Sequence, residues 1–166
     1  IITQRDVGLV SQVFKPHLIE HLNHGAATIG HVRYSTHGTS CPENAQPFAV
    51  QCRLGHVALA HNGNLVNAAA LIHHLEKAGA IFQTGLDTEV FTHLLSRSHS
   101  DDFVVALKEA MLQVQGAYSL TILHNHTLYA LRDPKGMRPL VLGKLPHATI
   151  VTSETCALDL VGAEYV

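Results

Sequence analysis

The sequence predicts an α+β fold, in which strands and helices form separate layers, and the order of its apolar patterns supports this class. Strand-like alternation covers the first third of the chain, helical spacing covers the middle, and strand-like alternation returns after Gly116. Segregated runs of this kind indicate a layered α+β domain rather than a parallel sheet of βαβ units. The 166 residues are 46% hydrophobic and contain no repeat or linker, so we expect one domain over residues 1–166.

The first part of the chain predicts strands. Gly8 to Phe14 alternates imperfectly and fits a short strand or a strand end. Ala26 to Tyr34, Phe48 to Cys52 and His56 to Ala60 are stronger strand candidates. The last two are separated only by Arg53-Leu54-Gly55, which is short enough for a hairpin.

Three helices are expected next. The first begins at Asn64, a good N-cap, and stops at Gly79. The second runs from Asp87 to Ser96, and the third from Asp101 to Gln115 with Ser100 as its cap and Gly116 as its end. The apolar face of the second helix consists of Val90, Phe91, Leu94 and Leu95.

The last part of the chain returns to strand-type alternation. Strands are expected at 117–123, 127–131, 139–142 and 149–152. Turns are expected at 124–126, 133–136 and 144–147, where Asn, Gly and Pro residues gather.

Composition excludes several classes of function. The net charge is only −2, so nothing favours nucleic acid or an anionic membrane as a partner. No apolar run is long enough to span a bilayer and the first residues have no signal-peptide layout, so we expect a cytoplasmic protein. The three cysteines lack paired spacing, and the 14 histidines form no metal-ligand motif. We therefore expect reduced thiols and no metal site.

Four polar clusters at the ends of the predicted elements could carry chemistry: HVRYSTHG (31–38), HNGN (61–64), DTE (87–89) and DPKGMRPL (133–140). Arg33 offers a planar fork for a carboxylate, although this segment alone favours a surface ion pair. Asn62 and Gly63 offer two donors that could form an oxyanion hole, although an Asn-Gly turn explains them equally well. Asp87 could serve simply as a partner of the helix dipole.

Taken together and in order, these clusters resemble a known family. HVRYST, NAQPF (44–48), AHNGNLVNA (60–68), DTEV (87–90), RDPKGMRPLVLG (132–143) and SETCALD (153–159) resemble the glutaminase domain of amidophosphoribosyltransferases. HNGN and DTE are shared by class II amidotransferases generally. Tyr34 after Arg33, NAQPF and DPKGMRPL indicate the purine enzymes in particular.

The resemblance implies a fold and a reaction. The fold is the four-layer αββα sandwich of N-terminal-nucleophile hydrolases, here without its first strand. The reaction is attack on the side-chain amide of glutamine by an N-terminal cysteine whose α-amino group is the base. The released ammonia displaces pyrophosphate from phosphoribosyl pyrophosphate on a second, phosphoribosyltransferase domain. That step begins purine synthesis.

The resemblance also assigns residues. Arg33 pairs with the α-carboxylate of glutamine and Asp87 with its α-ammonium, while the Asn62 amide and the Gly63 N–H stabilise the oxyanion. Tyr34, Thr36 and His37 shape the pocket.

The sequence departs from the family pattern at its start, because residue 1 is Ile and none of the cysteines is N-terminal. We therefore expect this piece alone to be inactive, with the nucleophile and the phosphoribosyltransferase domain lying outside it. The resemblance implies glutamine and that domain as partners, a homo-oligomer, no cofactor in this domain, and magnesium in the other. An iron–sulfur cluster occurs in some relatives, and this sequence does not decide for or against it.

Other hypotheses stay open at this point. The glutaminase domain of a sister enzyme such as glucosamine-6-phosphate synthase is the nearest, although that enzyme usually has Trp after the Arg. A glutamine-binding module without catalysis and a His-dependent metalloenzyme are the others.

Overall fold

The first sheet has four antiparallel strands in the order β1-β2-β3-β4. The computed structural model describes residues 1–22, 25–33 and 41–166. The strands are β1 (Phe48–Cys52), β2 (Gly55–Leu65), β3 (Gly116–His124) and β4 (Thr127–Arg132). The expected hairpin joins β1 to β2, where Cys52 pairs with Gly55.

A second, smaller sheet has the antiparallel order β6-β5-β7. Its strands are β5 (Val141–Leu145), β6 (Ala148–Thr152) and β7 (Glu164–Tyr165). The short helix α6 (Cys156–Val161) lies against this sheet at Gly143, where an added Cβ would come within 2.5 Å of Leu158 Cδ2.

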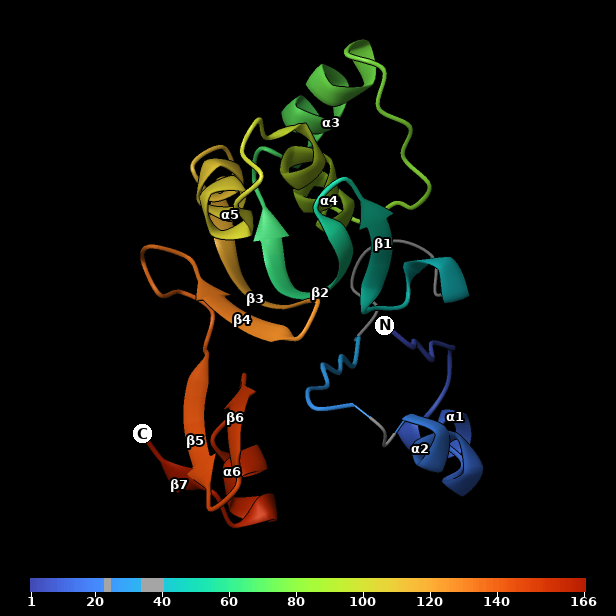
Figure 1. The fold of residues 1–166 in the computed structure, drawn as a ribbon, viewed down its shortest axis with the longest axis vertical. Helices are drawn as coiled ribbons and strands as arrows, with labels where there is room; N and C mark the ends of the chain where they lie inside the picture. The colour runs from blue at the N-terminus through green and yellow to red at the C-terminus, as the bar shows by residue number, and fades with distance from the viewer. Residues whose placement is uncertain (23–24, 34–40) are drawn as a thin grey trace.

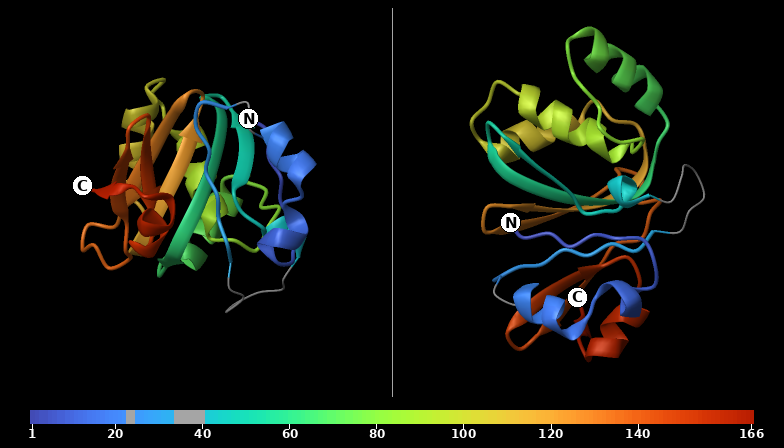
Figure 2. Two further views of the ribbon diagram at one scale, coloured as in Figure 1. Left: turned by 90° about the horizontal axis from the view of Figure 1, so that it is seen from below. Right: turned by 90° about the vertical axis from the view of Figure 1, so that its right-hand side faces the viewer.

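The elements form four layers (Figure 1; Figure 2, right). The helices α3 (Ala68–Lys77), α4 (Thr88–Arg97) and α5 (Phe103–Met111) cover the outer face of the first sheet. Beneath that sheet lies a layer that contains β5 to β7 and the extended segments 1–6 and 25–33. The helices α1 (Val10–Val13), α2 (Pro16–Leu22) and α6 form the outermost layer on that side. This arrangement is the αββα sandwich expected from the family resemblance.

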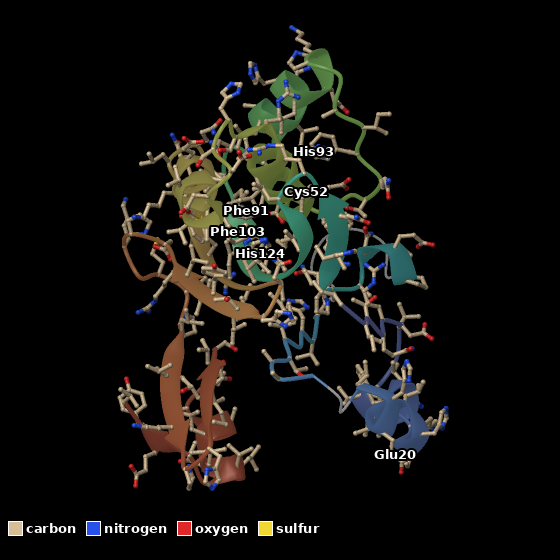
Figure 3. All side chains as sticks on the ribbon, in the orientation of Figure 1. Glu20, Cys52, Phe91, His93, Phe103 and His124 are labelled. Atoms are coloured by element: carbon tan, nitrogen blue, oxygen red, sulfur yellow. The ribbon has the colours of Figure 1, made fainter. Side chains whose placement is uncertain are left out.

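The main core lies between the first sheet and helices α3 to α5. Its fully buried members include Leu59 and Ile122 from the sheet and Phe91 and Ala106 from the helices. At one side of this core the Phe103 ring stacks on the His124 imidazole, with ring centroids 3.8 Å apart (Figure 3). The predicted apolar face of α4 is confirmed, since Val90, Phe91, Leu94 and Leu95 are all buried.

Three expectations near the N-terminus and in the centre of the chain are wrong. Gly8 to Phe14 contains the one-turn helix α1 instead of a strand. Residues 26–33 run extended, but no described neighbour pairs with them, so the described part is not a strand. Asn64 does not cap a helix; it lies inside β2, and α3 begins only at Ala68 after Asn67.

The third helix is shorter than expected. Asp102 rather than Ser100 caps α5, because its carboxylate accepts hydrogen bonds from the N–H groups of Val104 and Val105. The helix ends at Met111, and Gly116 begins β3 instead of stopping the helix. β5 also starts two residues later than expected, at Val141.

The loop after β4 folds around one carboxylate. The N–H groups of Tyr118, Lys135, Met137 and Arg138 all donate to Asp133, at 3.0 to 3.3 Å. Burial raises the pKa of Asp133, but the four amides together lower it by more than burial raises it. The pKa of Asp133 therefore lies below its ordinary value. The DPKGMRPL segment is thus a loop anchored to β3 at Tyr118.

This anchoring predicts a pH-dependent stability. A depressed carboxyl pKa stabilises the fold above the unfolded value, near pH 4, and the effect is lost as the pH falls through the lower folded pKa. We expect Asp133→Asn to lower Tm at pH 7, with the difference from wild type shrinking as the pH approaches 3. Asp159→Asn, at an exposed position on α6, is the matched control. A difference that stays constant from pH 7 to pH 3 would contradict the assignment.

Among the described residues, no helix has both the length and the apolar character needed to cross a membrane.

Candidate functional site

The HNGN cluster lies within β2, where one edge of the strand is open. β1 pairs with β2 only as far as Phe48 opposite Leu59. Beyond that point β2 continues to Leu65 and pairs with β3 alone, with Gly63 opposite Tyr118. Residues 61 to 65 therefore have β3 on one side, and on the other side no strand formed by the described residues pairs with them.

The amide of Gly63 points to this open edge. Backbone groups of antiparallel strands point alternately to one neighbour and to the other. Tyr118 lies opposite Gly63. Its N–H donates to the Asp133 carboxylate and its C=O accepts from the Asp133 N–H, both on the side of β3 that faces away from β2, so Gly63 and Tyr118 exchange no hydrogen bonds. Gly63 must then direct its own N–H away from β3.

The neighbouring amides on this edge are already occupied. The His61 N–H donates to Gln46 Oε1 at 2.6 Å, and the Leu65 N–H donates to Asp87 Oδ2 at 3.0 Å. Between them, no described residue outside the sheet accepts from the Gly63 N–H. One donor is thus held in place by its two neighbours and left open to a ligand.

Only glycine fits at position 63. Its φ is +155°, and an added Cβ would lie 2.2 Å from the Ala117 carbonyl oxygen and 2.6 Å from Tyr118 Cα. Gly116 shows the reciprocal contact, with φ +153° and an added Cβ 2.2 Å from the Asn64 carbonyl oxygen. Both contacts are with backbone, so no side chain can move aside to relieve them. The two glycines allow β2 and β3 to approach closely beside the open amide.

The side chain of Asn62 belongs to the inner face of the first sheet. Side chains alternate along a strand, and those of Leu59 and Leu65 pack in the core beneath the helices. Asn62 therefore shares the opposite face with Ala58 and Ala60, between the two sheets. It is half-buried, and its amide makes no hydrogen bond to another described residue.

Asp87 is placed at the start of α4 but does not act as its cap. No side-chain capping bond is present; instead Oδ2 accepts from the Leu65 N–H, and Oδ1 lies 3.2 Å from His61 Nδ1. The explanation of Asp87 as a helix-dipole partner is therefore insufficient. A carboxylate can accept about four hydrogen bonds, so capacity remains for a ligand.

The surroundings of Asp87 favour its charged form. Burial raises the pKa of Asp87, but the His61 imidazole, through its hydrogen bond and its charge, and the amides of Leu65 and Thr88 lower it. The net result is a pKa below the ordinary value. Asp87 is consequently a carboxylate at neutral pH, suitable as the partner of a cation.

His61 connects Asp87 to the helix layer. Its side chain is almost fully buried, with Thr88 Oγ1 3.3 Å from Nδ1 and the Phe91 ring edge-on at a centroid distance of 5.8 Å. Its Nε2 is buried without a partner among the described residues. His61 and Gln46 were not singled out in the sequence, because nothing local in HNGN or NAQPF shows that they support this edge.

Arg33 lies in a neighbouring cavity of about 210 Å³. His31 and Gln46 also line this cavity, whereas Asn62, Gly63 and Asp87 do not. Gln46 connects this cavity with the open edge of β2, because it lines the cavity and accepts a hydrogen bond from the His61 N–H. The structure thus brings Asn62, Gly63 and Asp87 to one strand edge and places Arg33 beside it. Tyr34, Thr36 and His37 lie outside the described residues.

His31 adds no positive charge to this cavity at neutral pH. Burial lowers the pKa of His31, a hydrogen bond from its imidazole to the backbone of His61 raises it, and the charges of His61 and Arg33 lower it again. The net pKa lies below the ordinary value. The cations that line this cavity are therefore the guanidinium groups of Arg33 and Arg5, and Arg5 donates to the Ala45 carbonyl. Within the described ranges, no group of three or more His, Cys, Asp or Glu side chains could hold a metal ion.

These groups are complementary to an amino acid with a side-chain carbonyl. A carboxylate and a guanidinium can hold the two charges of the zwitterion, and two amide donors can polarise a carbonyl oxygen. A family model described as "glutamine amidotransferase domain" matches residues 31–160, most of the chain. The chain belongs to this family of glutamine amidotransferase domains.

Within the family, the chain is homologous to the glutamine amidotransferase domain of amidophosphoribosyltransferases. It is 47% identical over 160 residues to amidophosphoribosyltransferase 3, chloroplastic, of Arabidopsis thaliana, covering 96% of this chain and 30% of the relative. It is 45% identical over 164 residues to the amidophosphoribosyltransferase of Staphylococcus aureus strain COL, covering 98% and 33%. The chain therefore spans about a third of the length of these relatives.

Two solved structures confirm the fold. A glutamine phosphoribosylpyrophosphate amidotransferase from B. subtilis, complexed with ADP and GMP, matches with a TM-score of 0.76 and 44% identity. That match covers 82% of this chain and 29% of the other. A structure described as the allosteric regulatory enzyme of purine biosynthesis matches with a TM-score of 0.86 and 41% identity, covering 96% and 34%.

Proposed function

We propose that this chain is the glutaminase part of an amidophosphoribosyltransferase and that it binds glutamine along the open edge of β2. Arg33 pairs with the α-carboxylate and Asp87 with the α-ammonium of the substrate. The Gly63 N–H and the Asn62 amide receive the side-chain carbonyl oxygen. The open Gly63 amide, held between two occupied neighbours, is the observation that supports this proposal most strongly.

The proposed reaction uses a nucleophile at the N-terminus of the processed protein. In the family pattern, an N-terminal cysteine thiolate adds to the amide carbon, whose oxygen becomes negatively charged. The α-amino group returns the thiol proton to the nitrogen, so collapse expels ammonia and leaves a thioester, and water then converts the thioester to glutamate and the free thiol. The oxyanion forms in both steps, so donors fixed in advance lower both barriers, by roughly 3 kcal/mol for each donor in well-studied enzymes.

The ammonia then serves a second domain in this proposal. There it displaces pyrophosphate from phosphoribosyl pyrophosphate and gives phosphoribosylamine. Magnesium would accompany the phosphate substrate in that domain, outside the residues of this chain. A homo-oligomer and a cytoplasmic location belong to the same proposal.

The test of this function is which substrate accepts the ammonia released from glutamine. The full-length protein, given glutamine and phosphoribosyl pyrophosphate, should form glutamate, pyrophosphate and phosphoribosylamine in equal amounts. Replacing the acceptor by fructose 6-phosphate should give no amino sugar. Amino-sugar formation would overturn the proposal in favour of a glucosamine-6-phosphate synthase, and the absence of any glutamate in both mixtures would overturn the glutaminase assignment.

Arg33→Lys tests the carboxylate contact. Lysine keeps the charge but loses the planar pair of donors, so the glutamine KM should rise by about tenfold or more. Ammonia-dependent synthesis bypasses this pocket and should be nearly unchanged. Both rates are measured on the same preparation, and an equal fall in both would show that Arg33 is only structural.

A further inference from the structure

The open part of the β2 edge is one residue long, and a side chain bounds it at each end. On this edge the N–H groups of residues 61, 63 and 65 point outward. Gln46 occupies the first and Asp87 the third, and no described residue occupies the Gly63 N–H between them. The length of the opening is therefore set by two side chains rather than by the sheet.

Gln46 takes the place of a strand residue. β1 and β2 are in register up to Phe48 opposite Leu59, and the same register continued by two residues would put Gln46 opposite His61. The ladder ends at Phe48, but the Gln46 side-chain oxygen still reaches the His61 N–H at 2.6 Å. This side chain thus supplies the acceptor that a longer β1 would have supplied from its backbone.

The Gly63 N–H stays uncovered because a side chain, and not a strand, accepts from the His61 N–H. A longer β1 would continue alongside β2 and would cover the Gly63 N–H as well. The Gln46 side chain instead accepts only from the His61 N–H and does not reach the Gly63 N–H. Gln46 is 9% exposed and lies between the cavity that contains Arg33 and the open strand edge, so the contact is sheltered from water.

Gly63 depends on such external support. Glycine has no side chain to fix its orientation, and its backbone can adopt more conformations than any other residue. On the side away from β3, the contacts that the described residues make to this edge are those to the His61 and Leu65 N–H groups. Loss of the His61 contact would leave this part of β2 paired with β3 alone and would let the Gly63 N–H turn away from a developing oxyanion.

We propose that Gln46 is a positioning residue of the glutaminase site, which holds the β2 edge so that the Gly63 N–H points at the reacting carbonyl. This inference rests on the proposed function and adds a residue that acts without touching the substrate. A purely structural role, satisfying one buried N–H, is the competing explanation. The two differ in kinetics, because a positioning defect appears in kcat while a structural defect lowers every activity together.

The experiment is Gln46→Met in the full-length protein. Methionine fills a similar volume but offers no oxygen to the His61 N–H. Glutamine-dependent kcat should fall by about tenfold, with the glutamine KM within about twofold of wild type and ammonia-dependent synthesis unchanged. Gln113→Met is the matched control, because Gln113 is exposed and its side-chain amide donates to the Glu109 carbonyl of its own segment, and the change should alter none of these values.

A second variant covers a failure of the first to fold. Gln46→Glu keeps an oxygen where the His61 N–H points and should retain more glutaminase activity than Gln46→Met. An unchanged kcat in Gln46→Met overturns the proposal, as does a parallel loss of glutamine-dependent and ammonia-dependent rates. Equal loss of glutaminase activity in the Met and Glu variants overturns it too.

Failure of the role proposed for Gln46 can be distinguished from failure of the proposed function. If the wild-type protein releases no ammonia from glutamine, the function itself is wrong. If Asn62→Ala slows the reaction and Gln46→Met does not, only the role of Gln46 is wrong.

Discussion

Asn62→Ala should lower the glutamine-dependent kcat by roughly a hundredfold or more and leave KM nearly unchanged. The Asn62 amide can strengthen its hydrogen bond only as the carbonyl becomes tetrahedral, so its loss affects the transition state more than the bound substrate. Ammonia-dependent synthesis should continue at the wild-type rate, since that reaction does not use the oxyanion hole.

Asn62→Asp separates catalysis from a turn role. A carboxylate cannot donate a hydrogen bond and repels an oxyanion, so Asp should be at least as harmful as Ala. A turn residue would tolerate Asp, because Asn and Asp serve turns almost equally well. The strand pairing of Asn62 with Ser119 already removes the turn explanation on structural grounds. Melting temperatures measured beside kcat complete the comparison, and a fully active Asp variant would rule out the oxyanion-hole assignment.

Asp87→Ala should produce the largest change in substrate binding. It removes the partner of the α-ammonium group, a charged hydrogen bond whose loss typically raises KM by about 10- to 100-fold. It also frees the Leu65 N–H, which bounds the opening beside Gly63. We therefore expect kcat to fall as well, unlike the result for Arg33→Lys.

Asp87→Asn separates the loss of the charge that binds the α-ammonium group from the loss of the contact to the Leu65 N–H. Asparagine keeps one oxygen that can accept from the Leu65 N–H, but it has no charge for the substrate. KM should rise almost as much as in the Ala variant, while kcat should stay closer to wild type. The kinetics of both variants against glutamine, with ammonia as the second nitrogen source, provide the measurement. Identical kcat values for the two variants would show that the contact to Leu65 has no catalytic consequence.

The sequence predicts the elements of the fold better than it predicts the local structure of the site. The apolar spacing of α4 identifies Val90, Phe91, Leu94 and Leu95 correctly because burial of that face depends only on residues within the helix. The turn at 124–126 is also correct, and Asn125 adopts a positive φ of 52° there. In both cases the signal is local.

The end of β2 could not be predicted in the same way. HNGN has the composition of a turn followed by a helix cap, which placed the end of the strand too early. The strand continues because side chains distant in sequence satisfy its outward amides, Gln46 from 15 residues before His61 and Asp87 from 22 residues after Leu65. Such contacts follow from the tertiary fold, and no periodicity in the local sequence reports them.

The candidate site was predicted from family resemblance rather than from physical pattern. When considered alone, Arg33, Asn62, Gly63 and Asp87 each had a structural explanation that was at least as good as the functional one. The structure weakens two of those explanations, because Gly63 lies in a strand where only glycine fits, and Asp87 does not cap its helix. The supporting residues Gln46 and His61 are visible only in three dimensions.

The central claim is that glutamine lies along the open edge of β2, and a structure of the full-length protein with bound glutamine tests it most directly. The claim predicts the side-chain carbonyl oxygen within hydrogen-bonding distance of both Gly63 N and Asn62 Nδ2, at about 2.7 to 3.1 Å. The α-ammonium should contact Asp87 and the α-carboxylate should contact Arg33. Glutamine bound elsewhere, or bound with its amide oxygen turned away from the Gly63 N–H, would contradict the claim.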